Sequence, residues 1–231
     1  MTAPRRALIV IDAQQEYFTG LLPIQYPPRE ESIQRIAAAI DAAEKADIPV
    51  VTVQHSAGDE SPVFNPTMTE FQLHSSLEER KSDAWKSVVK QYSSIFPGTG
   101  LVEWLRENGI DTITLTGYMT NNCIIASAAE AEIHAFNTEV LSDATGAINI
   151  SNSAGTVDAK TVHTTLMALL NSNFAAVAST DDWARAVETE QPLGKSNLVE
   201  SAADGAAASL ARSRAAWISS ARAAASPGAP T

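Results

Sequence analysis

The sequence predicts an α/β fold in which helices cover both faces of a mainly parallel sheet. Continuous apolar runs such as ALIVID at 7–12 are typical of strands that are buried on both faces, as they are in a parallel sheet. Between such runs lie stretches with apolar residues at helical spacing. Strand and helix alternate along the chain, which is the pattern of βαβ units.

The first half of the chain shows this alternation. Residues 32–46 predict a helix, because isoleucine recurs at helical spacing and Ser32 is a suitable N-cap. A second strand follows at 48–53. The stretch 56–80 has scattered Pro, Asn and Ser without a firm period, so we expect a long loop with one short helical piece. Residues 86–90 (KSVVK) predict the third strand.

The second half continues the pattern with clearer boundaries. Gly109 ends one helix, Gly117 allows a sharp turn after a strand, and Asp158 is a suitable N-cap for a late helix. The predicted helices are 101–108, about 120–135 and 158–170, and the predicted strands are 111–116, 139–142 and 174–178.

The composition changes near the C-terminus. We expect one domain at residues 1–190, followed by an extension at 191–231 that is rich in Ala and Ser. The extension is either a helix, docked on the body or on a neighbouring subunit, or a disordered tail. The helix is favoured because Ala is the best helix former.

Charge and cysteine content restrict the possible partners. A formal net charge of −11 argues against a surface that neutralises nucleic-acid phosphates. No apolar run is long enough for a signal-peptide core or a membrane span, so we expect a cytoplasmic protein. The single cysteine, Cys123, excludes an intrachain disulfide and any zinc site of several cysteines.

Reactive side chains follow the predicted strands. Asp12, His55 and Lys90 stand at or just beyond the ends of the first three strands, and Cys123 stands where the helix after Gly117 begins. Ligands of open parallel sheets bind beyond the carboxyl ends of the strands, so we expect these groups to meet there. Helix N–H groups and Lys90 would favour the thiolate and lower the pKa of Cys123, while Asp12 could accept the thiol proton.

Each of these residues also has an ordinary structural interpretation. A lone Cys is usually a small core residue, an Asp after a strand is often a turn residue, and a lone Lys is commonly solvated. Their convergence at one edge of the sheet favours a nucleophile, a base and a cation that work together.

Several segments resemble isochorismatase-like cysteine hydrolases. The segments ALIVIDAQQEYF (7–18), VVKQYSSIF (88–96) and LTGYMTNNCIIASAAEA (115–131) look like the signatures of that superfamily. SDATG (142–146) and TVHTTLMALL (161–170) resemble its later strand and helix, and the similarity spans roughly residues 5 to 180. The resemblance implies a three-layer α/β/α sandwich around a mainly parallel sheet.

The resemblance also implies roles for residues of the site. Asp12, Lys90 and Cys123 match the catalytic triad of the family, with a cis peptide between Tyr118 and Met119. The backbone N–H groups of Met119 and Cys123 would form the oxyanion hole. The residues expected to bind substrate, each of which could instead serve packing, are Tyr17, Phe18, His55, Phe96, Tyr118 and Asn122.

Departures from the family pattern narrow the expected chemistry. Nicotinamidases of this superfamily hold a metal with an Asp and three His; here His55 and His74 could match two ligands, but Val53 stands where the Asp would be. We therefore expect no metal and no cofactor. Several isochorismatases lack the cysteine, so its presence favours an amidase.

The leading hypothesis is a metal-independent cysteine amidohydrolase that acts on a small amide or ureido compound through a thioester. Two alternatives remain open: a vinyl-ether hydrolase of the isochorismatase type, and a non-catalytic sensor that uses the thiol of Cys123 on the same scaffold. The family resemblance also implies a homo-oligomer, either a dimer or a tetramer.

Overall fold

The computed structural model describes residues 3–224, and the chain divides into two compact units. The first unit ends at Lys195 and the second begins at Ser196. The described part of the second unit consists mainly of one helix, α7 (Leu198–Ala224), so this stretch is helical. The remainder of the predicted extension, 225–231, lies outside the described residues.

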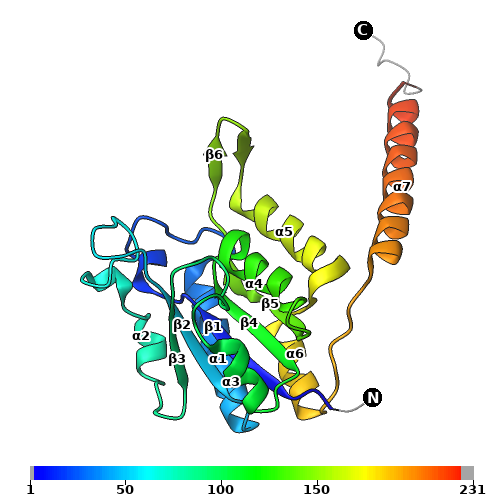
Figure 1. Cartoon of the computed structure of the whole chain (residues 1–231). Coiled ribbons are helices and arrows are strands. Elements are labelled where there is room, and N and C mark those ends of the chain that lie inside the picture. Colours follow the sequence, from blue (N-terminus) through cyan, green and yellow to red (C-terminus); the bar gives the residue numbers. More distant parts are fainter. Residues whose placement is uncertain (1–2, 225–231) are drawn as a thin grey trace. The chain divides into compact units, whose positions relative to one another are not determined.

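A six-stranded parallel sheet forms the centre of the first unit, in the order β3-β2-β1-β4-β5-β8 (Figure 1). The predicted α/β class with a mainly parallel sheet is therefore confirmed. The strands are β1 (Arg6–Ile11), β2 (Val50–His55), β3 (Lys86–Lys90), β4 (Thr112–Tyr118), β5 (Asn137–Gly146) and β8 (Ala176–Ala178).

Helices cover both faces of the sheet, and each face has its own apolar core. One core packs against α1 (Arg29–Lys45), α2 (Ser75–Glu78) and α6 (Thr180–Glu188). The other packs against α3 (Leu101–Glu107), α4 (Ile125–Ala131) and α5 (Ala159–Leu169). Successive residues of β1 alternate between the two cores, which explains why its sequence is apolar without interruption.

Of the two predicted N-caps, one is confirmed and one is wrong. Asp158 caps α5 as predicted, since its side chain accepts a hydrogen bond from the Thr161 N–H. The predicted N-cap at Ser32 is wrong, because α1 begins at Arg29 after Pro28. Ser32 is buried inside the helix, where its hydroxyl lies 2.7 Å from the hydroxyl of Tyr118.

Some elements have no counterpart among the predictions. The predicted 120–135 helix is shorter: a wide π-type turn at Thr120–Ile124 precedes α4. Helix α6 and a hairpin of β6 (Ile150–Asn152) and β7 (Gly155–Val157) were not predicted. The loop after β2 contains a 3-10 turn at Thr69–Phe71 in addition to α2. Along the described residues, no helix is both long and apolar enough to cross a membrane.

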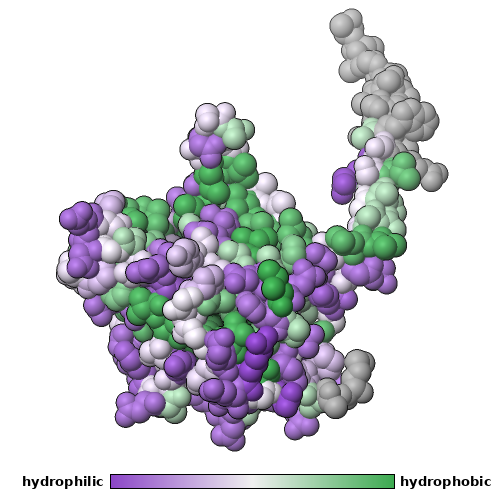
Figure 2. Space-filling view, viewed as in Figure 1, coloured by the Kyte–Doolittle hydropathy of each residue, from purple (hydrophilic) through white to green (hydrophobic). Residues whose placement is uncertain are grey.

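The surface around α5 is unusually poor in charge. Between residues 144 and 178 the only charged side chains are Asp158 and Lys160. Leu169 and Val157 are each 41% exposed. Figure 2 shows apolar side chains gathered at the base of the hairpin and over the neighbouring helices.

A buried ion pair lies near the amino ends of β1 and β5. Arg6 on β1 and Glu139 on β5 form two short contacts, Nη2 to Oε1 at 2.9 Å and Nε to Oε2 at 3.0 Å. Thr114 and Trp183 each donate a further hydrogen bond to Oε2. Arg6 also donates to the carbonyl of Gln191. Glu139 thereby connects β1, β4, β5 and α6, and Arg6 connects the ion pair to the segment that follows α6.

Candidate active site

Asp12, Lys90 and Cys123 meet at the carboxyl edge of the sheet. Asp12 follows β1 with φ +49°, Lys90 ends β3, and Cys123 lies in the turn after β4. Lys90 Nζ lies 2.7 Å from Asp12 Oδ2 and donates a hydrogen bond to Cys123 Sγ at 3.3 Å. None of the three residues is more than 3% exposed. The structure therefore brings together the three residues proposed as a triad.

Gly117 lets β4 approach β1 closely. Its φ is +95°, and a Cβ at this position would overlap the backbone of Ile11, the residue before Asp12. The following peptide, between Tyr118 and Met119, is cis, as predicted. This geometry leads the chain from β4 into the turn that carries Cys123.

Hydrogen bonds from several elements hold the turn of Cys123. The N–H groups of Asn122 and Ile124 both donate to the carbonyl of Met119, at 3.1 and 3.2 Å. Ser127 Oγ donates to the carbonyl of Cys123 at 2.6 Å. At the start of the turn, Thr120 Oγ1 lies 3.0 Å from Nδ1 of the buried His163.

The pKa of Cys123 is raised rather than lowered. Burial of the thiol, followed by the charge of Asp12, raises this pKa to about 12, and these causes outweigh the opposing charge of Lys90. The predicted lowering is therefore wrong. Burial also raises the pKa of Asp12, while Lys90 opposes this shift. The resting site thus contains a protonated thiol next to a buried ion pair.

His55 lies on the other side of Lys90. Its Nδ1 is 3.2 Å from Lys90 Nζ, and burial together with the Lys90 charge lowers its pKa to about 4. The buried side chain of Gln14 accepts a hydrogen bond from the His55 N–H and donates to the carbonyls of His55 and Phe71. Gln14 was not among the predicted site residues, and the signal that could have identified it is its position two residues after Asp12.

Aromatic rings line the region beside Asp12. Tyr17 packs between Phe64 and Tyr118, with both ring centroids at 5.4 Å. Burial raises the pKa of Tyr17, and the thiolate form of Cys123 and the charge of Asp12 add to this shift, so its hydroxyl lies near both groups. Phe18 packs edge-on against Tyr118. The structure thus brings Tyr17 near Asp12 and Cys123, whereas Phe18 packs against Tyr118 and His74.

The other residues expected to bind substrate are Tyr118, Asn122 and Phe96, and they lie in three different environments. Tyr118 is fully buried, and its hydroxyl forms a hydrogen bond with Ser32. It therefore packs beneath Tyr17 and Phe18 and has no exposed surface for a substrate. Asn122 is half-buried in the turn of Cys123. Phe96 is not brought to the triad: it packs in the core against His134 and Phe136. The apolar character of Phe96 serves packing at that position.

The buried carboxylate of Glu16 was not predicted. Glu16 is 1% exposed, and its oxygens accept hydrogen bonds from the N–H groups of Leu21 and Phe64. Gly20 packs against this side chain so closely that a Cβ there would meet the carboxylate. Glu16 therefore ties the loop after β2 to the segment that carries Tyr17.

The donors present do not fit a metal site of the nicotinamidase kind. Val53 offers no ligand atom, and His55 directs Nδ1 at the ammonium of Lys90. His74 uses Nδ1 to cap α2, accepting from the Ser76 N–H. Within residues 3–224 no cluster of three or more His, Cys, Asp or Glu side chains is placed to hold a metal ion.

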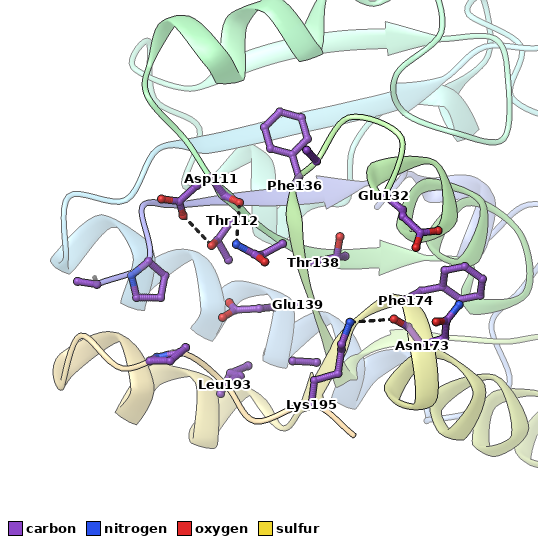
Figure 3. A pocket seen from close by; sticks show the side chains of 16 residues that line it. Asp111, Thr112, Glu132, Phe136, Thr138, Glu139, Asn173, Phe174, Leu193 and Lys195 are labelled. Atoms are coloured by element: carbon purple, nitrogen blue, oxygen red, sulfur yellow. Dashed lines mark hydrogen bonds between the residues drawn. The ribbon is translucent and has the colours of Figure 1, made fainter. Parts of the chain in front are cut away.

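Figure 3 shows a cavity of about 610 Å³. Its lining does not include Cys123, because it lies at the opposite edge of the sheet. It is formed around the amino ends of β4, β5 and β8, with Phe136 and Phe174 among its walls. Lys195 spans part of it and donates a hydrogen bond to the carbonyl of Asn173. The reactive groups lie at the other end of the strands, so this cavity is not the candidate active site.

Comparison with known proteins identifies the family. The model of the isochorismatase domain matches residues 6–182, which is most of the chain. The chain belongs to the isochorismatase family. The resemblance seen in its three segments is thereby confirmed, and the protein is a hydrolase of this family.

Individual relatives agree with this placement. The chain is 44% identical to a candidate isochorismatase from Burkholderia xenovorans LB400, whose crystal structure superposes with a TM-score of 0.88, covering 90% of this chain and 100% of that one. An uncharacterised isochorismatase family protein of Bacillus subtilis is 29% identical over 76% of this chain and 96% of its own length. The maleamate amidohydrolase of Pseudomonas putida is 30% identical over 61% of this chain and 71% of its own length.

Proposed function

We propose that this protein is a metal-independent cysteine amidohydrolase that cleaves a C–N bond of a small amide or ureido compound. The observation that carries the proposal is the position of Lys90 Nζ, within reach of both Asp12 Oδ2 and Cys123 Sγ in one buried site. A nucleophile, a proton acceptor and a fixed positive charge are the groups that acyl transfer requires.

Asp12 is the proposed base for the first step. Because the thiol is protonated at rest, the proton must leave as the sulfur attacks the substrate carbonyl. Asp12 Oδ1 has no partner that meets hydrogen-bond geometry within the described residues, so it can accept this proton. As the S–C bond forms, the negative charge passes from Asp12 to the carbonyl oxygen of the substrate, so Lys90 is left between a neutral carboxyl group and a neutral sulfur while the oxyanion carries the charge.

The tetrahedral intermediate needs donors for its oxyanion. The N–H groups of Met119 and Cys123 are the proposed donors. Among the described residues the Met119 N–H makes no backbone hydrogen bond, whereas the Asn122 and Ile124 N–H groups are both used by the Met119 carbonyl. When the C–N bond breaks, the proton on Asp12 passes to the leaving ammonia or amine. Water then hydrolyses the thioester, with Asp12 as the base.

The names of two relatives support cleavage of an amide. One is the maleamate amidohydrolase of Pseudomonas putida, and another is nicotinamidase 3 of Arabidopsis thaliana, which is 26% identical over 62% of this chain. His55, Tyr17, Phe18 and Asn122 are the proposed substrate-binding residues. The proposed location is the cytoplasm.

The experiment is a measurement of ammonia release from a panel of small amides, ureido acids and nicotinamide. Wild-type protein is compared with Cys123→Ala, and intact-mass spectrometry of quenched wild type detects the thioester. Release by wild type that is abolished in the variant supports the proposal. Equal release by both proteins contradicts it, and so does consumption of isochorismate by both proteins when no amide is cleaved.

We also propose a homo-oligomer, a dimer or a tetramer, that buries the charge-poor surface around α5. With a net charge of −11, two copies repel each other least through a surface that carries almost no carboxylates. A C2 interface places the same surface on both partners, so the apolar side chain of Leu169 would meet apolar groups. Light scattering after size exclusion should give a multiple of 24.5 kDa for wild type and a monomer for Leu169→Glu. A monomeric wild type would contradict this.

A further inference from the structure

The ring of His55 is held between two groups of fixed position. Nδ1 lies 3.2 Å from Lys90 Nζ, and the ring stands edge-on to Phe64 with centroids 5.0 Å apart and an interplanar angle of 88°. Gln14 fixes the backbone of His55 from both sides, through its N–H and its carbonyl. A ring constrained in this way has a defined direction for each nitrogen.

The chemistry of Lys90 determines which nitrogen of His55 carries hydrogen. An ammonium group has three hydrogens to donate and no lone pair to accept with. Its ion pair with the buried Asp12 keeps it charged, and the Tyr92 carbonyl and Cys123 Sγ share its three hydrogens with Asp12 and His55. Because the ammonium has no lone pair, the Nδ1 that faces it must present a lone pair rather than a hydrogen. A neutral imidazole that accepts at Nδ1 carries its hydrogen at Nε2.

The opposite nitrogen, Nε2, has no hydrogen-bond partner within the described residues. The ring is only half-buried, so Nε2 is accessible to a ligand. Burial and the charge of Lys90 both lower the pKa of His55, so the ring stays neutral at ordinary pH. An N–H donor without a protein partner therefore lies beside the ammonium that contacts the nucleophile.

We propose that His55 Nε2–H donates a hydrogen bond to an acceptor atom of the substrate and so selects small amides that carry such an acceptor beside the scissile amide. The acceptor is a lone pair of a ring nitrogen, a carbonyl oxygen or a carboxylate oxygen. This inference rests on the proposed amidohydrolase function. It assigns to His55 a positioning role for substrate, with Lys90 fixing its tautomer.

The tautomer can be measured without any activity. The ¹⁵N spectrum of the histidine rings of the full-length protein should show a neutral Nε2–H form for His55 between about pH 5.5 and 8. The chain has four histidines, so the signal that disappears in His55→Asn identifies the residue. A neutral Nδ1–H form or an imidazolium at pH 7 would overturn the inference, whatever compounds the enzyme cleaves.

Substrate selection is tested by binding to the inactive Cys123→Ala protein. Two pairs of compounds have the same shape and differ by the acceptor: nicotinamide with benzamide, and maleamate with its Z methyl analogue, isocrotonamide. Calorimetry should give about tenfold tighter binding for the member that carries the acceptor, as expected for one hydrogen bond of about 1–1.5 kcal/mol. Equal affinities within both pairs, or no binding of any of the four compounds, would overturn the selection.

Two substitutions separate this role from a structural one. Asn at position 55 retains an acceptor near Nδ1 for Lys90 but removes the donor at Nε2, whereas Gln extends an amide towards the Nε2 position. In the Cys123→Ala background, His55→Asn should remove the tenfold preference, and His55→Gln should restore part of it. A loss of affinity that is equal for both members of each pair would show a structural role only.

Discussion

Replacement of Asp12 by Asn should make Cys123 more acidic and the enzyme less active. In wild type, a pKa of about 12 instead of the ordinary 9.0 disfavours the thiolate by about 4 kcal/mol. Burial is the largest cause and the charge of Asp12 is the second. Asn keeps the size of the side chain, removes that charge and leaves Lys90 beside the sulfur. Removing a contacting like charge should lower the pKa of Cys123 by about 1–3.

Alkylation kinetics measure this acidity directly. Cys123 is the single cysteine, so intact-mass spectrometry counts one modification per chain without ambiguity. At pH 8 about one wild-type molecule in 10⁴ holds a thiolate, and the iodoacetamide rate should rise about tenfold for each pH unit up to pH 10. Asp12→Asn should react faster at pH 8 and reach a plateau earlier. Since the two proteins bury the sulfur equally, the ratio of their rates reports acidity rather than access.

The same variant should lose about 10²–10⁴-fold in amide hydrolysis, because it has lost its base. A wild-type plateau below pH 9, or slower alkylation of Asp12→Asn than of wild type at pH 8, would refute the electrostatic reasoning. Circular dichroism of both proteins serves as the control for folding. Protein unfolded in urea should titrate near the ordinary pKa of a cysteine.

Other predictions concern stability. Glu139→Gln leaves Arg6 buried without its partner and should cost about 3–5 kcal/mol in urea unfolding, and much less in an Arg6→Met background. Gly117→Ala forces a Cβ into the backbone of Ile11 at positive φ and should cost about 2–6 kcal/mol; a normal urea midpoint would contradict the close approach. Because the pKa of His55 is lowered in the folded protein, His55 binds a proton more readily in the unfolded chain. Its contribution to the free energy of unfolding is therefore present above pH 6.5 and is lost as the pH falls towards 4. His55→Asn should remove about 1–2 kcal/mol of that pH dependence, a value reduced for the solvent screening of a half-buried ring; an unchanged slope between pH 7 and 4.5 would contradict it.

The parallel sheet could be predicted because its signal is local. Each residue of β1 faces one of two cores, so a strand of this kind is apolar throughout and is visible in the sequence alone. The start of α1 was misplaced because Pro28 and the packing of Ser32 against Tyr118 decide it, and the second of these is a long-range contact. In α6, Trp183 and Val187 lie four residues apart on the buried side, but acidic and basic residues around them hid the helix.

The meeting of Asp12, Lys90 and Cys123 could be predicted for the same reason as the sheet. Residues at the carboxyl ends of adjacent parallel strands converge, so their positions follow from the strand assignments. The pairing of Gln14 with the backbone of His55 could not be predicted in this way, because it depends on the register of β1 and β2. The sign of the Cys123 pKa shift was wrong because helix position and neighbouring charge can be read from a sequence, but the depth of burial cannot.

The raised pKa of Cys123 argues against the alternative in which this residue is a redox sensor. Sensor cysteines are accessible and have lowered pKa values, because oxidants react with the thiolate. Cys123 is 3% exposed, and its pKa is raised. A thiol of this kind is inert until a base removes its proton, and the carboxylate that could do so is already beside it, paired with the lysine that contacts the sulfur. In the proposed mechanism this arrangement protects the sulfur from chance oxidation and produces a nucleophile only when a carbonyl group is in place to be attacked, which is what a hydrolase requires and a sensor does not.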